Sequence, residues 1–319
     1  MKSLLRAFAL TRQSSRIVLW IYGINALLSL LILLPAYSTL GAEMGRSMAF
    51  PNLLNGFDST VFSDFMETSG AAVTPLLAVG RWLGIGWLIA SVFLSGGILL
   101  RFSQPDEPVQ ARVFLAGCAQ YFGRYAGLLG VVTLFFGVLS VIILLIGTLI
   151  GAALFNGVTE QMLLYVGIGT VVIMLLIGAL IFCIGDYAKV LLFRQDDHNA
   201  FRAFGRAGRL VLAKPGQTFV PYLMLITVGT ALFGLYFLAD DLIGMRNWPT
   251  IIILFVLQQA FIAGRVFLKV WSLGMAYGIS ATLIKPVPIK SAVVSSRFEE
   301  STDSIEPTSD KATQSPTDQ

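Results

Sequence analysis

Residues 125–153 read YAGLLGVVTLFFGVLSVIILLIGTLIGAA, a run without a single Asp, Glu, Lys or Arg. A helix needs about 20 apolar residues to cross the roughly 30 Å hydrocarbon core of a bilayer, so this run is long enough to span a membrane. The whole chain of 319 residues is 56% hydrophobic and only 13% charged. Because a soluble domain needs more charge than this to cover its surface, the composition indicates an integral membrane protein.

Five further apolar runs reach a similar length. In chain order, the six predicted spans are 17–37, 78–100, 125–153, 162–185, 217–238 and 249–273. The first follows several basic residues, as a secretory signal does, but its apolar stretch of about 20 residues exceeds the 7–15 of a cleavable signal, so we interpret it as an uncleaved signal anchor. The sequence therefore predicts an all-α polytopic membrane protein with a membrane domain over 1–284. Its tail, 285–319, is rich in Ser, Thr, Pro and acidic residues, which predicts cytoplasmic disorder.

Lysine and arginine are distributed unevenly between the two sides that this topology defines. Of 22 such residues, 17 lie in the N-terminal segment, in the tail, or in the segments that join spans two to three and four to five. Only Arg46, Arg81 and Arg246 fall on the other side. Since loops rich in Lys and Arg remain in the cytoplasm, we expect both termini there and the protein in the cell membrane. Cys118 and Cys183 would then lie at the cytoplasmic ends of spans as reduced thiols.

Three segments on the basic side have the amphipathic pattern of helices that lie along a membrane surface. These elbow helices are predicted at 2–12, 109–125 and 199–213. Each precedes a pair of spans, an order consistent with a three-fold pseudo-repeat about an axis along the membrane normal. In the third segment Arg202, Arg206 and Arg209 share one face. We expect them to contact anionic lipid headgroups on the cytoplasmic side, and not nucleic acid.

The longest loop on the opposite side, 41–75, has an amphipathic pattern of its own. Residues 57–68 read FDSTVFSDFMET and gather four apolar side chains on one face: Val61, Phe62, Phe65 and Met66. Asp58 precedes them in the position of a helix N-cap. We therefore expect a short helix here that lies on the outer leaflet or covers the bundle.

Five short stretches of the chain contain recognisable sequence motifs. They are GFDSTVFSDF (56–65), FLSGGILLRF (93–102), CAQYFGRYAGLL (118–129), DYAKVLLF (186–193) and LQQAFIAGRVFLKVW (257–271). Together, and in this order, they resemble an uncharacterised family of bacterial six-span integral membrane proteins. The resemblance covers most of residues 1–284 and implies the six-span topology. It implies no reaction, substrate or catalytic residue.

Two cations lie within the sixth predicted span. Arg265 and Lys269 are one helical turn apart, and with Gln258 and Ser272 they fall near one helical face. Such a polar stripe normally faces the bundle, because charge exposed to hydrocarbon is costly. We expect Asp186, at the cytoplasmic end of the fourth span, to pair with Arg265, while Lys269 extends to the lipid phosphates. The stripe predicts either a structural ion pair or an inner-leaflet site for an anion or a lipid headgroup.

Other reactive residues indicate no particular chemistry. Asp196, Asp197 and His198 are adjacent in one loop, where ligands rarely converge on one ion, so we expect Asp197 or Asn199 to cap the following helix and no metal to bind. His198 is the only histidine in the chain, and no zinc, redox or nucleophile motif accompanies it. We expect no bound cofactor.

Three classes of function remain open at this point. We favour a structural or accessory envelope protein that binds a membrane-protein partner, because the elbow helices and the outer loop offer surfaces and the predicted spans lack a carboxylate near their middle. The alternative is a transporter or lipid-handling protein with an anionic site at the inner leaflet, based on the polar stripe. A membrane enzyme is least favoured, since no paired carboxylates occur at a common depth.

Overall fold

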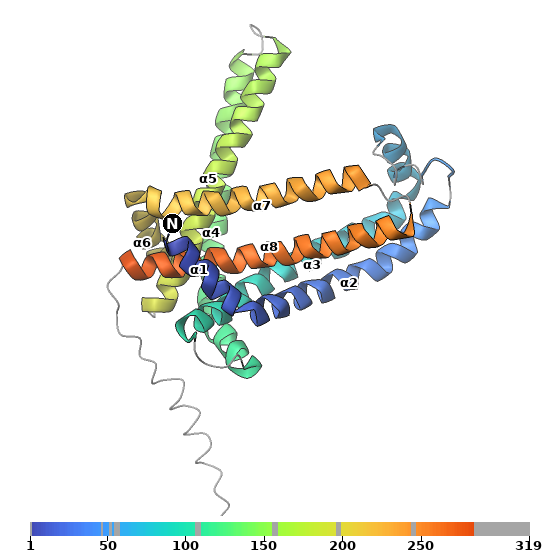
Figure 1. Ribbon diagram of the computed structural model, residues 1–319. Helices are drawn as coiled ribbons and strands as arrows, with labels where there is room; N and C mark the ends of the chain where they lie inside the picture. The colour runs from blue at the N-terminus through green and yellow to red at the C-terminus, as the bar shows by residue number, and fades with distance from the viewer. Residues whose placement is uncertain are drawn as a thin grey trace, which may run out of the picture. The chain divides into compact units, whose positions relative to one another are not determined.

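The computed structural model describes residues 2–45, 47–50, 53, 58–105, 110–154, 159–195, 199–243 and 247–283. Within these ranges eight α-helices follow one another: α1 (Lys2–Gln13), α2 (Ser15–Met44), α3 (Ser59–Ser103), α4 (Ala111–Leu154), α5 (Glu160–Gln195), α6 (Ala200–Ala213), α7 (Pro215–Ile243) and α8 (Trp248–Leu283) (Figure 1). The described residues contain no strand, so the predicted all-α class is confirmed. The predicted tail, 285–319, lies outside the described residues.

Six of these helices are long and apolar enough to cross a membrane. They are α2, α3, α4, α5, α7 and α8, and each contains one of the six predicted spans. Several extend well past the predicted run: α3 has 45 residues and α4 has 44. The chain is therefore a multi-pass membrane protein whose spans continue as helix beyond the apolar stretch.

The predicted elbow helices are only partly separate elements. α1 and α6 are individual helices. Lys214 alone separates α6 from α7, whose first residue is Pro215; a proline is tolerated there because the first N–H of a helix has no partner. The second predicted elbow, 109–125, is instead the beginning of α4 from Ala111 onward. No proline occurs between Ala111 and Leu154 to break that helix, so elbow and span are continuous.

Two predicted helix caps can be compared with the structure. The carboxylate of Asp58 accepts hydrogen bonds from the backbone N–H groups of Thr60 (2.8 Å) and Val61 (3.3 Å) and so caps α3 as predicted. The side chain of Asn199 accepts a hydrogen bond from the backbone N–H of Arg202 (3.3 Å) and caps α6. Of the two residues proposed for that cap, Asn199 is therefore the one that the structure assigns.

The predicted outer helix over 57–68 does not form a separate element. Residues 59–68 are the first turns of α3, which runs through Pro75 and into the second span without a break. Phe65 and Val73 of this part of α3 pack with Phe50 in a small apolar cluster. The expectation of an independent surface helix is therefore wrong, because the helical pattern continues through the proline.

The main hydrophobic core lies toward one end of the helices, where α1, α6 and the C-terminal end of α8 gather (Figure 1). In α4, for example, the buried residues all fall between Phe114 and Val132. Close approach of two backbones helps to build this core: a Cβ placed on Gly96 of α3 would lie only 2.8 Å from the carbonyl oxygen of Gly117 in α4. Glycine at position 96 thus permits a contact that a larger residue would prevent.

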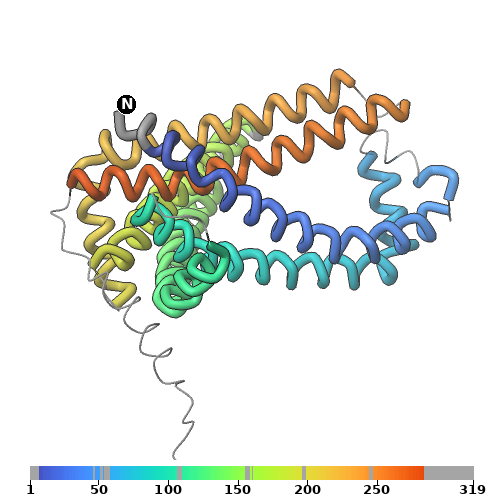
Figure 2. Tube along the Cα trace, turned by 60° about the horizontal axis from the view of Figure 1, so that its bottom comes forward, coloured from blue at the N-terminus to red at the C-terminus, as the bar shows by residue number. Residues whose placement is uncertain are grey.

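Beyond the core, α4 and α5 continue as a hairpin that diverges from the other helices (Figure 1). Gly147 of α4 lies against Thr170 of α5, at a position where a Cβ would meet the threonine side chain within 2.6 Å. The remaining spans associate in pairs, and Figure 2 shows α2 beside α3 and α7 beside α8. Away from the core the spans expose many apolar side chains, including Leu149 of α4 and Leu235 of α7, as is typical of surfaces that face lipid.

Candidate functional site

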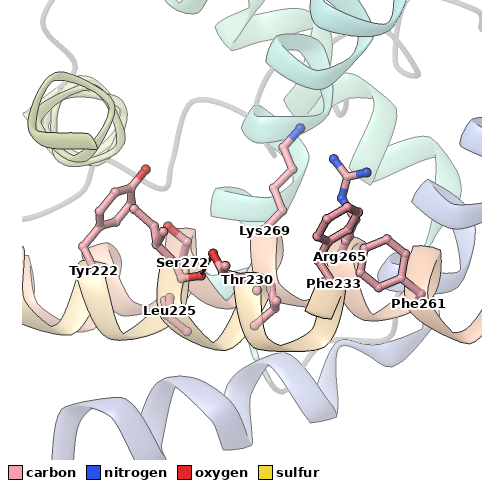
Figure 3. A pocket seen from close by; sticks show the side chains of 11 residues that line it. Tyr222, Leu225, Thr230, Phe233, Phe261, Arg265, Lys269 and Ser272 are labelled. Carbon is pink, nitrogen blue, oxygen red and sulfur yellow. Dashed lines mark hydrogen bonds between the residues drawn. The ribbon is translucent and has the colours of Figure 1, made fainter. Parts of the chain in front are cut away.

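A cavity of about 580 Å³ lies where α7 and α8 pack together, and we call it the α7–α8 cleft. Its lining residues are Tyr222, Leu225, Ile226, Gly229, Thr230 and Phe233 of α7 and Phe261, Arg265, Leu268, Lys269 and Ser272 of α8. Figure 3 shows the cationic ends of Arg265 and Lys269 and the hydroxyl of Tyr222 directed to the same side. The cleft therefore combines largely apolar walls with two positive charges.

The sequence of α8 explains how one helix serves both the core and the cleft. Val266 and Val270 are buried in the core, whereas Arg265 and Lys269, each one position earlier, are exposed. Because an α-helix has 3.6 residues per turn, neighbouring positions face different surroundings. Within the same two turns, Val266 and Val270 thus form an apolar face, and Arg265 and Lys269 form a cationic face beside it.

Lys269, which the sequence predicts to reach the lipid phosphates, has partners within the protein. Its ammonium group donates a hydrogen bond to the hydroxyl of Ser91 in α3, and it lies 4.8 Å from the centre of the Trp87 ring. The indole N–H of Trp87 in turn donates to the side-chain oxygen of Asn25 in α2 (2.7 Å). A hydroxyl and an aromatic face give the ammonium partners inside the protein, so Lys269 connects α8 with α3 and, through Trp87, with α2.

Asp186 does not pair with Arg265, which corrects a second expectation. One carboxylate oxygen of Asp186 lies 2.9 Å from the ammonium of Lys189, one turn later in α5, and the other accepts a hydrogen bond from the Ser272 hydroxyl at 3.0 Å. Ser272 is seven residues beyond Arg265, about 10 Å along the helix axis. The carboxylate therefore lies at the level of Ser272, out of reach of Arg265, and both of its oxygens already have donors.

Among the described residues, the one specific side-chain interaction of Arg265 is with an aromatic ring. Its guanidinium carbon lies 5.9 Å from the centre of the Phe261 ring, one turn earlier in α8. Within the described part of the chain neither Arg265 nor Lys269 forms an ion pair, whereas Asp186 is neutralised by Lys189. The cleft therefore carries two positive charges, neither of which forms an ion pair within the described residues.

Gln258, the fourth member of the predicted stripe, does not line the cleft. It is exposed in the N-terminal half of α8. The polar contact in this region comes from the next residue, because the hydroxyl of Tyr22 in α2 donates to the side-chain oxygen of Gln259 at 2.6 Å. Of the residues predicted as a stripe, the structure thus brings Arg265, Lys269 and Ser272 together and leaves Gln258 apart.

The basic residues of α6 lie away from the cleft. Ala203, Phe204, Ala207 and Val211 form the face of α6 that is buried against α4 and α5. Arg202 and Arg209 are exposed, and Arg206 is half-buried. None of the three arginines lines the cleft, so they form a separate basic surface.

Two further predictions concern possible reactive groups. The three adjacent residues Asp196, Asp197 and His198 lie outside the described residues. Among the described ranges, no three His, Cys, Asp or Glu side chains are placed to hold a metal ion. Cys118 and Cys183 are buried free thiols in different helices.

Sequence reasoning missed four residues that shape the site: Trp87, Ser91, Lys189 and Tyr222. Only Lys189 has a local signal, because an acid and a base three residues apart are neighbours on a helix. Trp87, Ser91 and Tyr222 come close to α8 only through tertiary packing, and no sequence pattern around them predicts these contacts.

Comparison with protein-family models, curated proteins and solved structures gives no match for this chain. Its function therefore has to be inferred from the geometry and charge of the cleft.

Proposed function

We propose that this multi-pass membrane protein handles lipid by binding an anionic amphiphile in the α7–α8 cleft. The observation that carries the proposal is the presence of two cations, Arg265 and Lys269, that form no ion pair within the described residues and line a cavity with largely apolar walls. Its volume of about 580 Å³ lies within the range of roughly 300–1,000 Å³ that is typical of ligand pockets.

The cost of charge near hydrocarbon gives the physical reason. An isolated cation close to the bilayer interior is unfavourable, and such residues usually mark a ligand or ion pathway. An anionic headgroup beside Arg265 and Lys269 would offset that cost, at about 1 kcal/mol for each basic residue near the membrane surface. The aromatic side chains of Phe233 and Phe261 would then contact the first carbons of the ligand.

We further propose that both termini face the cytoplasm, in the cell membrane, and that the cleft opens toward the inner leaflet. The lysine and arginine distribution supports this orientation. On α6 the exposed Arg202 and Arg209 lie beside two exposed apolar residues, Phe201 and Leu212. A helix with basic and apolar residues on its free surface fits an interface with anionic lipid, so α6 would contact the same leaflet.

Lipid binding to matched variants tests the proposed function. The protein would be reconstituted in nanodiscs of neutral lipid with or without an anionic lipid, and retained lipid would be counted by native mass spectrometry. Arg265→Gln and Lys269→Gln should each reduce retention of the anionic lipid. Arg81→Gln is the control, since Arg81 is an exposed arginine of α3 that does not line the cleft. Equal retention by all variants would rule the proposal out.

A partner-binding accessory role is the second candidate, and the α4–α5 hairpin favours it. Ile168 and Val171 of its outer half are exposed, and Gly167 has open space where a side chain would be. Such small residues let another helix approach closely in a membrane. A photocrosslinker at position 168 should give one discrete protein adduct in cells if a partner docks there, and lipid adducts alone if none does.

A further inference from the structure

We infer that the headgroup bound in the α7–α8 cleft is a phosphomonoester, so that the ligand is a lipid with a terminal phosphate. The inference rests on the proposed function, because it names the ligand class of the same cleft. It depends on three independent properties of the cleft: its charge, the geometry of its donors and its apolar wall.

The charge of the cleft matches a dianion better than a monoanion. Arg265 and Lys269 contribute two positive charges, and the nearby Asp186 is already paired with Lys189. A phosphate monoester carries about −1.5 to −2 charges at pH 7. A phosphodiester headgroup or a fatty-acid carboxylate carries one negative charge and would leave one cation uncompensated beside hydrocarbon, which is unfavourable.

The donors of the cleft match the terminal oxygens of a monoester. An arginine can hold two phosphate oxygens with its planar fork, while a lysine acts as a single point charge. Arg265 and Lys269 are four residues apart, about 6 Å along the helix axis, so their groups are neighbours. A monoester offers three terminal oxygens, enough for both residues, whereas a diester offers two.

Tyr222 adds a donor on the α7 side of the cleft. Its hydroxyl makes no hydrogen bond to another residue within the described part of the chain, although it lines the same cavity as the two cations. In Figure 3 it points to the same side as Lys269 and Arg265. Lys269 already has Ser91 as a partner, so the ligand would share its ammonium with that hydroxyl.

The apolar wall distinguishes a lipid from a soluble phosphate ester. Leu225, Ile226, Phe233 and Phe261 line the cleft beside the cations. Along α7 the same helical face continues from Phe233 to Phe237, one turn later, which is 65% exposed. An acyl or isoprenoid chain could follow this surface into the hydrocarbon, whereas a soluble ester would gain little from it.

The test compares lipids that differ in the charge of the phosphate. Neutral phosphatidylcholine nanodiscs would contain phosphatidic acid, a monoester, or phosphatidylglycerol, a diester with similar chains, and retained lipid would be counted at two pH values. Above about pH 7 we expect phosphatidic acid to bind about fivefold tighter. Below about pH 5.5 this advantage should disappear, because the second ionisation of a monoester has a pKa of about 6. A further arm adds inorganic phosphate as a competitor.

Variants distinguish the preference for a monoester from the binding of anionic lipid in general. Arg265→Lys keeps the charge and removes the fork, so it should lower the preference for the monoester while retaining anionic lipid. Tyr222→Phe should weaken the monoester alone, and Tyr165→Phe, on an exposed tyrosine of α5 that does not line the cleft, should change nothing. Thermal unfolding of each variant in neutral nanodiscs checks that its fold is intact.

Each outcome bears on a different statement. Equal binding of both lipids, with loss in Arg265→Gln, would overturn the monoester inference and leave the proposed function standing. Binding of both lipids that is indifferent to Arg265→Gln would overturn both. Displacement of the lipid by inorganic phosphate at similar concentration would show that the wall contributes nothing, and would overturn the lipid part of the inference.

Discussion

The carboxylate of Asp186 has a hydrogen-bond donor for each of its oxygens, one from Lys189 and one from Ser272. Each oxygen of Asp186 has one donor, at 2.9 and 3.0 Å. Hydrogen bonds to charged groups contribute about 1.5–3 kcal/mol when they are partly buried, and removal of one partner leaves the other without compensation. Arg265, by contrast, makes no hydrogen bond within the described residues, so its charge is available to a ligand.

This difference predicts that substitutions of Asp186 and Arg265 affect stability unequally. Asp186→Asn should lower the free energy of unfolding by about 1–3 kcal/mol, because Lys189 loses its counter-charge. The double change Asp186→Asn with Lys189→Met should recover part of the loss, since no lone ammonium remains. Arg265→Gln should leave stability in neutral nanodiscs within about 0.5 kcal/mol of the parent. Thermal unfolding compares the parent, these three variants and Lys189→Met, and strictly additive effects of the changes at 186 and 189 would contradict the pairing.

At the scale of the helix, the crossing of α3 and α4 depends on glycine. A Cβ on Gly96 would lie 2.8 Å from a backbone oxygen of α4, which cannot move aside as a flexible side chain can. Gly86, three turns earlier in α3, has open space around it. Packing therefore requires glycine at position 96 and leaves room for a side chain at position 86, although both residues lie in the same helix.

We predict that Gly96→Ala destabilises the protein by about 1–3 kcal/mol through overpacking of the α3–α4 crossing. Gly86→Ala is the matched control and should be neutral or stabilising by up to about 1 kcal/mol, because alanine is the better helix former. Thermal unfolding in detergent or nanodiscs compares the two. Equal effects at both positions would mean that the helices do not approach each other at Gly96.

The helices themselves could be predicted from the sequence, whereas their contacts could not. Apolar runs such as 125–153 require a helix in lipid, because every backbone polar group there must be satisfied internally. The sequence pattern did not show that residues 111–125 continue into this span as one helix. An amphipathic segment followed by an apolar one suggests two helices even where a single helix contains both. The partners of a side chain are harder to predict: helical spacing favours Lys189 as a partner of Asp186, but only tertiary packing brings Ser272 to it.

At the scale of the molecule, α8 is the element through which the parts of the membrane domain are joined. It packs against α1, α2, α3, α5 and α7. Its Phe267 and Trp271 contact Phe8 of α1 edge-to-face, while Lys269 reaches α3 and Ser272 reaches α5. A ligand that draws Lys269 into the cleft would therefore act on the contact between α8 and α3.

The orientation of the whole molecule gives the last prediction. Because loops rich in Lys and Arg remain inside, both ends of the chain should be cytoplasmic. Cys118 and Cys183 are buried, so a variant with one added cysteine reports on that position alone once the background of the parent is subtracted. Asp64→Cys, at the exposed start of α3, should react in intact cells with a thiol reagent that cannot cross the membrane. Ala213→Cys, at the exposed end of α6, should react only after the cells are permeabilised. If position 213 were labelled in intact cells and position 64 were not, the molecule would be inverted, and the cleft would open to the outer leaflet and bind a different pool of lipid.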